Sequence, residues 1–199
     1  MGYLCEVLQL RGAIRLAVST LGEILEKKLK VLLELRGYRL LERKDYDGGA
    51  YITVEHKDEK ILIWAISSRT TVGKDMIVRF KKRIDEDETL KRGIIITNGR
   101  YTVSAKSEAQ KEGIELIPQN FPTFNVFEHA LVPKHEILTP EEREEILKKY
   151  KVKPYQIPNI SASDPIVRVI GARPGDILRI TRKSPTAGVY VSYRYVVED

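Results

Sequence analysis

A polar turn between two apolar segments carries the side chains best suited to contact with an anion. In the segment GIIITNGRYTVSAKSEAQKEGIELI, residues 93–117, Thr102 and Ser104 place hydroxyls at the start of a predicted helix. The free amides and positive dipole end of a helix N-terminus attract phosphate, and Arg100 and Lys106 add charge on either side. The turn therefore predicts contact with backbone phosphates, which does not depend on the base sequence. The alternative is that both hydroxyls only cap the helix.

Other patterns that would indicate catalysis are weak. The three histidines, His56, His129 and His135, do not cluster with cysteine, so a metal site is not expected. The sequence has neither the phosphate-binding GxxxxGK[ST] pattern nor the GxSxG pattern of serine hydrolases. Its single cysteine, Cys5, allows no internal disulfide and is expected to be a small buried hydrophobic residue. We therefore expect no catalytic residue, no cofactor and no metal.

Composition and charge are those of an ordinary globular protein. Of the 199 residues, 42% are hydrophobic and 31% are charged, which fits one or two packed domains. The net charge of +6 permits weak attraction to phosphate or to acidic protein surfaces but does not establish a nucleic-acid binder. No apolar run approaches the roughly 20 residues that span a bilayer. We expect a cytoplasmic location, or a nuclear one in a eukaryote, and neither a membrane nor a small-molecule partner.

The residues around the turn predict an α/β unit. A helical stripe begins near Thr20, whose spacing to Glu23 fits a capping box, and Gly37 is expected to end it. Three extended segments then predict an antiparallel meander, at 38–43, 50–55 and 61–66. The elements that follow alternate helix and strand, at 74–84, 93–97, 103–112 and 114–117. Because a strand, helix and strand in succession form a right-handed parallel crossover, we expect an α/β sandwich.

A second, smaller domain is predicted after a proline-rich stretch. Four prolines interrupt residues 118–140, and a second capping box at Thr139 predicts a helix that ends near Tyr150. The last predicted elements are a short helix and two strands, at 164–171, 176–182 and 188–197. We therefore divide the chain into an N-terminal domain, 1–127, and a small α+β domain, 128–199. Residues 1–18 are assigned no role.

The N-terminal domain resembles the restriction-endonuclease-like fold, in particular its Mrr-type branch. The resemblance lies in the order of elements and in the residues Gly93 to Thr97, Thr102, Ala105, Ala109 and Gly113 to Ile117. Active members carry an Asp on one strand and (Asp/Glu/Gln)-x-Lys on the next, because metal-dependent hydrolysis needs acidic ligands and a Lys near the attacking water. Here the register places Tyr51, Trp64 and Ile66 at those positions. The resemblance therefore implies an inactive nuclease-like domain.

Three carboxylates near these positions are candidates for substitute metal ligands. Asp45, Asp47 and Glu55 lie close together in the sequence. However, the 61–66 strand has no Lys, and Trp64 is too bulky to leave room for a hydrated ion. A residual Mrr-like endonuclease is therefore the disfavoured alternative.

The C-terminal domain carries the denser resemblance. Its motif residues are His129 to His135, Tyr150, Gln156 to Pro158, Asp164-Pro165, Gly175-Asp176, Arg182 to Ser184, Thr186 to Gly188 and Tyr193-Arg194. They are similar to the conserved module of the small RNA polymerase subunit called H in archaea and subunit 5 in eukaryotes. In that family the module docks on the largest subunit, and the longer eukaryotic form adds an N-terminal jaw domain of nuclease-like fold.

This resemblance implies a non-catalytic subunit of a DNA-directed RNA polymerase. Its expected partners are the largest subunit, neighbouring small subunits and downstream duplex DNA, and no cofactor is implied. The candidate docking residues are His129, Pro133, His135, Asp164, Pro165, Arg182, Ser184, Thr186, Gly188, Tyr193 and Arg194. The candidate DNA contacts are Arg100, Tyr101, Thr102, Ser104 and Lys106, where Val103 replaces the Pro of the family's Thr-Pro-Ser-Ala turn. A free-standing DNA-binding protein is the other alternative.

Overall fold

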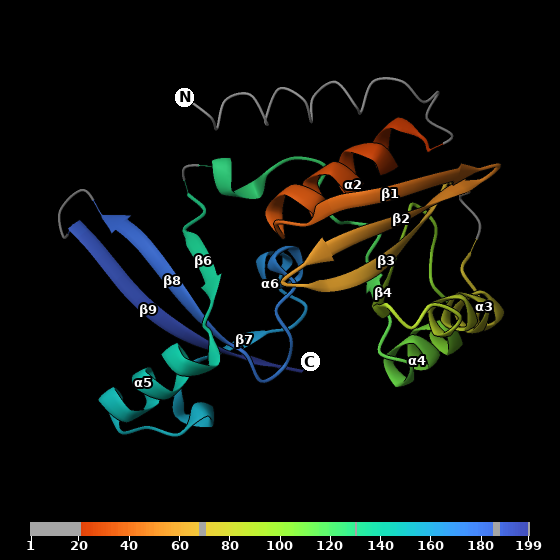
Figure 1. Ribbon diagram of the computed structural model, residues 1–199. Helices are drawn as coiled ribbons and strands as arrows, with labels where there is room; N and C mark the ends of the chain where they lie inside the picture. Colours follow the sequence, from red (N-terminus) through yellow and green to blue (C-terminus); the bar gives the residue numbers. More distant parts are fainter. Residues whose placement is uncertain (1–20, 68–70, 130, 185–187, 199) are drawn as a thin grey trace.

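The computed structural model describes residues 21–67, 71–129, 131–184 and 188–198. Figure 1 shows a sheet in each half of the chain, with helix α6 (Pro165–Ile170) lying between them. Cys5, residues 1–18 as a whole and Thr186 lie outside the described residues. No helix within the described residues has the length and apolar character needed to cross a membrane.

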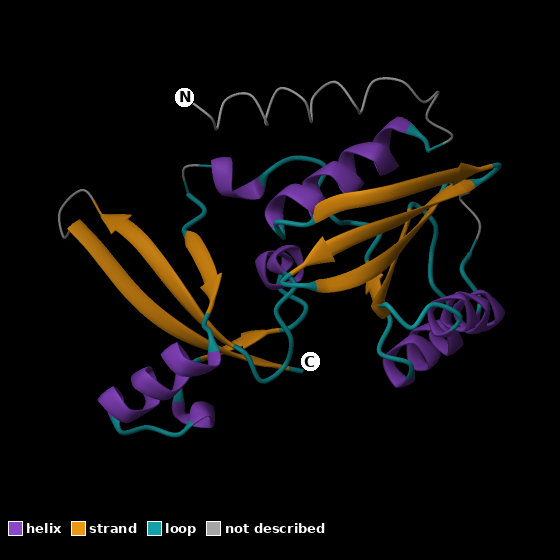
Figure 2. Cartoon of the chain, viewed as in Figure 1, coloured by secondary structure: helices purple, strands orange, loops and turns teal. Residues whose placement is uncertain are grey.

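The N-terminal half is the expected α/β sandwich (Figure 2). Its elements are α2 (Glu23–Leu35), β1 (Arg39–Tyr46), β2 (Gly49–His56), β3 (Glu59–Ile66), α3 (Lys74–Asp85), β4 (Leu90–Thr97), α4 (Val103–Lys111) and β5 (Glu115–Ile117). The sheet order is β1-β2-β3-β4-β5. The first three strands are antiparallel, whereas β3, β4 and β5 run parallel. The predicted meander and crossover are therefore confirmed.

Alternating side chains of the sheet form two cores, one on each face. On β3, Ile61, Ile63 and Ala65 pack in the cluster that contains the leucines of α2. Their neighbours Leu62 and Trp64 pack in the cluster that contains residues of α3 and α4. Because successive residues of a strand point to opposite faces, a continuous apolar run is what a strand covered on both faces requires.

One local prediction in this half is wrong and one is confirmed. The N-cap of α2 is Gly22, and it makes no side-chain capping bond, so the capping box proposed for Thr20 does not start the helix. Thr20 itself lies outside the described residues. The stop at Gly37 is confirmed, since its φ of 62° is the left-handed conformation that commonly follows a helix and that glycine adopts at little cost.

The C-terminal half is a four-stranded sheet with order β6-β8-β9-β7. Its elements are η1 (Val126–Glu128), β6 (Lys134–Ile137), α5 (Pro140–Tyr150), η2 (Pro154–Gln156), β7 (Asn159–Ser161), α6, β8 (Ile177–Ser184) and β9 (Gly188–Val197). The predicted capping box of α5 is confirmed, because the Thr139 hydroxyl accepts a bond from the Glu142 amide and the Glu142 carboxylate accepts one from the Thr139 amide. Strands β6 and β7 were not predicted.

The two helices of this half cover opposite faces of its sheet. Ile146 and Leu147 of α5 pack with Ile177 of β8, whereas Val167 of α6 packs with Leu178, the next residue of the same strand. The far end of the β8–β9 hairpin extends beyond both helices (Figure 1). That end leaves Tyr190 61% exposed, which provides a surface for a partner.

Candidate functional site

The residues that the sequence predicts at the catalytic positions of the nuclease-like fold belong to an aromatic stack. Tyr51 on β2 lies directly opposite Trp64 on β3, and Ile66 lies opposite Gly49. The Tyr51 and Trp64 rings stack with centroids 5.5 Å apart, and Tyr46 stacks on the outer face of Tyr51 at 5.3 Å. Aromatic rings and an isoleucine side chain offer a metal ion no carboxylate ligand.

Polar contacts fix this stack in place. The Trp64 indole Nε1–H donates to the Tyr46 hydroxyl at 2.6 Å, and the Arg83 guanidinium lies 4.1 Å from the centre of the Tyr51 ring. Phe80 of α3 closes the inner end, 5.5 Å from Trp64. Trp64 is 7% exposed, so its indole donor would be costly to leave unpaired. The site therefore works as a structural element of the fold.

Two of the three nearby carboxylates are held by arginines. Asp45 pairs with Arg43 at 3.0 Å, and Glu55 forms an ion pair with Arg39. Within the part of the chain that the structure describes, no group of three or more His, Cys, Asp or Glu side chains is arranged to hold a metal. The arrangement offers no route to the nuclease chemistry of active members.

The turn from Asn98 to Ala105 is tied to three other parts of the N-terminal half. Buried Lys28 of α2 donates to the Asn98 side chain at 2.9 Å and to the Gln119 carbonyl at 2.6 Å. On the other side, the Val72 amide donates to the Arg100 carbonyl at 2.8 Å, and the Val72 carbonyl accepts from the Thr102 amide at 3.1 Å. The backbone of the turn is therefore held from both sides.

The candidate DNA contacts in this turn have different surroundings. The Thr102 hydroxyl caps α4 by accepting a bond from the Ala105 amide at 3.1 Å, and the Ser104 hydroxyl lies 3.1 Å from it. The Tyr101 hydroxyl bonds to the carbonyls of Ile95 and Ile117 in the sheet, and burial raises its pKa. Tyr101 is thus anchored inward, which sequence reasoning did not anticipate.

Arg100 and Lys106 remain available at the surface. Both residues are exposed, and neither makes an ion pair with another residue in the described ranges. The predicted capping alternative thus applies to Thr102, while no ion pair among the described residues competes with ligand contact at the two flanking charges.

The candidate docking residues fall into separate groups. Arg182 lies opposite Tyr190, and Arg194 lies opposite Leu178. Because Leu178 and Arg182 are four residues apart on β8, Arg182 and Arg194 lie on the same face of the β8–β9 hairpin. Tyr193 is next to Arg194 on β9, so its side chain lies on the other face, where it packs with the residues under α5. Ser184 pairs with Gly188 at the hairpin end. The structure therefore gathers only part of the set on one surface.

The remaining docking candidates lie near the start of this half. His129 is exposed and accepts a bond from the Leu131 amide, while His135 bonds to the Pro133 carbonyl at 2.8 Å and lies opposite Ile180 of β8. Asp164 caps α6 by accepting from the Ile166 amide at 2.8 Å, with Pro165 in the first turn. These contacts give Asp164 and Pro165 a local structural role as well.

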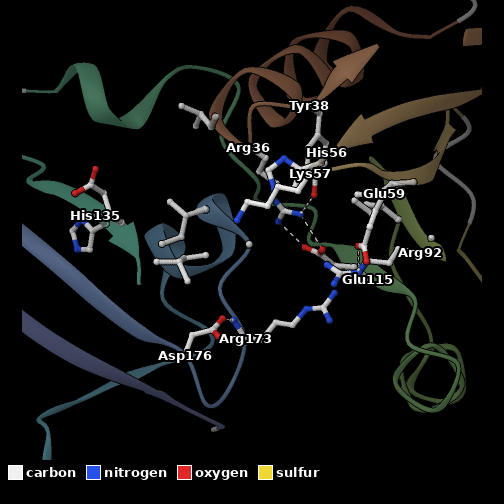
Figure 3. A pocket seen from close by; sticks show the side chains of 18 residues that line it. Arg36, Tyr38, His56, Lys57, Glu59, Arg92, Glu115, His135, Arg173 and Asp176 are labelled. Carbon is white, nitrogen blue, oxygen red and sulfur yellow. Dashed lines mark hydrogen bonds and ion pairs between the residues drawn. The ribbon is translucent and has the colours of Figure 1, made fainter. Parts of the chain in front are cut away.

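Arg36 joins the two halves, and Figure 3 shows its ion pair with Glu115. Its guanidinium pairs with Glu115 of β5 at 2.6 and 2.9 Å and donates to the Arg168 and Val169 carbonyls of α6 at 2.7 and 3.2 Å. Val169 is fully buried in the core under α2. Sequence reasoning missed this contact because its partners are far apart along the chain.

The fold and the filled site together define a class: a catalytically inactive nuclease-like domain joined to a small α+β module. Two family models match the chain. The restriction endonuclease family matches residues 19–120, and the family "RNA polymerase Rpb5, C-terminal domain" matches residues 124–196.

Named relatives identify the family. Subunit Rpo5 of DNA-directed RNA polymerase from Pyrococcus abyssi is 60% identical over 76 residues, which are 38% of this chain and 93% of the relative. RPABC1 of RNA polymerases I, II and III from Caenorhabditis briggsae is 34% identical over 181 residues, 88% of this chain and 85% of the relative. The chain belongs to the Rpb5/Rpo5 family of RNA polymerase subunits. It is a non-catalytic subunit, and neither alternative is favoured.

Proposed function

We propose that residues 128–199 dock the chain on the largest polymerase subunit and neighbouring small subunits, while residues 1–127 form a jaw near downstream DNA. The exposed charges of the Asn98–Ala105 turn carry the DNA part of this proposal. Arg100 and Lys106 flank the Thr102 and Ser104 hydroxyls at the start of α4, a chemistry suited to backbone phosphates. The contact would position DNA without reading its sequence.

The docking role is supported by the size of the archaeal relatives. Rpo5 of Pyrococcus abyssi matches over 93% of its length with only 38% of this chain. A module of that size is therefore a polymerase subunit in its own right in that organism. In this chain the same module exposes Arg182 and Tyr190 at the end of a hairpin that extends away from the rest of the molecule (Figure 1).

Docking is tested with the full chain carrying Arg182→Ala and Arg194→Ala. The two guanidiniums lie on one face of the hairpin, and charge-assisted bonds to a partner would be lost together. Reconstituted polymerase should incorporate this variant less efficiently than wild type, as measured by gel filtration. The matched control, Arg143→Ala with Lys149→Ala on α5, removes the same charge from the opposite face and should incorporate normally. Equal incorporation of both variants would contradict the docking role.

DNA contact is tested by Arg100→Ala with Lys106→Ala in assembled polymerase. Loss of two phosphate contacts should shorten the lifetime of elongation complexes. The slope of the logarithm of the binding constant against the logarithm of salt concentration should become shallower by up to about two. Catalysis per bound complex should be unchanged. Arg79→Ala with Lys82→Ala on α3 removes equal charge elsewhere and serves as the control. Equal lifetimes and slopes for the turn variant and wild type would leave the turn with only its capping role.

The proposed location follows from the polymerase. Membership of this family implies an intracellular protein, and we propose the cytoplasm, or the nucleus if the source is a eukaryote.

A further inference from the structure

A cleft of about 1020 Å³ separates β5 from the segment around α6. Strand β5 and residues of the Asn98–Ala105 turn line one wall, and Ala162, Arg168 and residues 171–174 line the other. We call this space the β5 cleft. Both halves of the chain contribute to it. The proposed docking and DNA contacts assign no role to β5 or to Arg168 and Arg173.

The β5 cleft is rich in unneutralised positive charge. Its cations are Arg100 and Lys106 from the N-terminal half and Arg168 and Arg173 from the C-terminal half. Across the described ranges, none of these four forms an ion pair with a carboxylate. The acidic residues that line the cleft are Glu115 and Glu198, and Glu115 is already paired with Arg36. The cleft therefore favours an anionic occupant.

The wall of the cleft is also the edge of a sheet. Strand β5 ends the order of the N-terminal sheet, and among the described residues it pairs only with β4. An unpaired strand edge can accept an extended peptide through backbone hydrogen bonds. The opposite wall includes small residues, among them Ala162, Gly171 and Ala172. Small side chains leave room for the added chain.

Size and lining distinguish between anionic occupants. A space of this volume suits one extended chain rather than a duplex, whose major groove alone is about 12 Å wide. Proteins that hold single-stranded nucleic acid stack its bases on aromatic side chains. Of the described residues that line the cleft, only Tyr101 is aromatic, and its hydroxyl is bonded inward to the sheet. These features favour a peptide over a nucleic acid.

We infer that the β5 cleft binds an extended acidic segment of a partner protein. The segment lies along β5 as an added strand, and its carboxylates pair with Arg168 and Arg173. Arg100 and Lys106 also line the cleft and add attraction. This inference does not depend on the proposed DNA contact, because Arg168 and Arg173 are not part of that contact.

The test uses the full chain and a fluorescein-labelled ten-residue peptide of alternating Glu and Val. Fluorescence anisotropy should show saturable binding that Arg168→Ala with Arg173→Ala weakens by roughly tenfold or more. Arg168 gives Arg36 its carbonyl rather than its side chain, so the substitution retains that contact. Arg79→Ala with Lys82→Ala removes the same charge on α3 and should bind like wild type. A peptide with Gln in place of Glu should not bind.

Two further measurements separate this inference from its rivals. Hydrogen exchange of the β5 amides should slow when the acidic peptide is bound, and unchanged exchange would overturn strand addition. A ten-nucleotide single-stranded thymidine oligomer should bind more weakly than the peptide. If it binds more tightly, with the same loss on Arg168→Ala and Arg173→Ala, the cleft is a nucleic-acid site and the inference is wrong. If the α3 control variant weakens peptide binding as much as Arg168→Ala with Arg173→Ala, the binding is general charge attraction and the inference is wrong.

Discussion

Arg36 and Glu115 form a two-pronged ion pair at the junction of the two halves, with Nη2–Oε1 at 2.6 Å and Nη1–Oε2 at 2.9 Å. The Arg36 side chain is 3% exposed. Burial alone would lower the pKa of Arg36, but the Glu115 carboxylate and the Tyr38 hydroxyl together outweigh it and the net shift is upward. The guanidinium therefore stays charged and uses its remaining donors on carbonyls of α6. One side chain thus links β5 to α6.

Arg36→Lys should loosen the junction while leaving each half folded. Lysine cannot reproduce the planar fork that reaches the carboxylate and two carbonyls at once. Breaking a buried pair of this kind should lower the free energy of unfolding by about 2 to 4 kcal/mol. Spin labels placed on α3 and α5 should report a broader distance distribution by electron paramagnetic resonance.

Arg43→Lys is the matched control for this substitution. Arg43 pairs with Glu26 at 2.6 Å, but both residues belong to the N-terminal half and the Arg43 side chain is 22% exposed. Its replacement should cost less than about 1 kcal/mol and leave the distance distribution unchanged. A distribution broadened equally by both substitutions, or by neither, would rule out Arg36 as the residue that sets the junction.

Gly171→Ala should disturb the same junction from the other side. Gly171 has a φ of 74°, and a Cβ there would lie 2.9 Å from Cζ of Arg36, whose position is fixed by its bonds. Gly175 has a φ of 99° but open space around a Cβ. Both alanines pay for a left-handed backbone, about 1 to 2 kcal/mol. Thermal unfolding should show the larger loss for Gly171→Ala, and equal losses would contradict the contact with Arg36.

The elements of this fold follow from local patterns wherever those patterns are strong. The continuous apolar runs of β3 and β4 and the capping box of α5 are written in neighbouring residues, so the sandwich and the α5 helix were predictable. Strands β6 and β7 have four and three residues and no alternating pattern, and their partners are β8 and β9. Such short strands exist because of pairing that local propensity does not encode.

The candidate site was predictable to a similar extent. The strands that carry Tyr51 and Trp64 were predicted, and the two residues face each other on β2 and β3, while their assignment to catalytic positions stays a prediction. The contacts that fix the Asn98–Ala105 turn and the junction were not predictable. Lys28 reaches Asn98 across 70 positions, and Arg36 reaches Glu115 across 79. No local pattern marks a buried cation whose partners are that distant.

Tyr46→Phe should destabilise the aromatic stack by leaving the Trp64 indole N–H without its acceptor. The loss of a hydrogen bond to a buried donor costs about 1 to 3 kcal/mol. Trp64 is the single tryptophan of the sequence, so its fluorescence reports directly on this site during urea unfolding. Tyr155→Phe, at a residue 67% exposed, is the control and should be neutral. Equal midpoints for the two variants would remove the structural role assigned to the Tyr46 hydroxyl.

Glu142 should titrate below the ordinary range of a glutamate. The bond from the Thr139 amide is the main cause of its lowered pKa, and the bond from Arg179 adds to it. A lowered folded-state pKa means that the stability Glu142 contributes is present above its unfolded pKa and is lost as pH falls through the folded value. Arg179→Gln should raise the pKa of Glu142 partway, as followed by carboxyl-carbon NMR. A pKa that does not respond to Arg179→Gln would contradict the ion pair.

The purified chain should leave supercoiled DNA intact in the presence of magnesium or manganese. Both ions need oxygen ligands, and hydrolysis by the motif of this nuclease fold, which lies on two adjacent β-strands, needs a lysine beside the attacking water. The three matching positions hold Tyr51, Trp64 and Ile66, packed in the core that contains Phe80 of α3. A gel assay with a matched active nuclease as positive control measures the result. Nicking that persists through further purification and disappears on Asp47→Ala would show that a metal site exists near the meander after all.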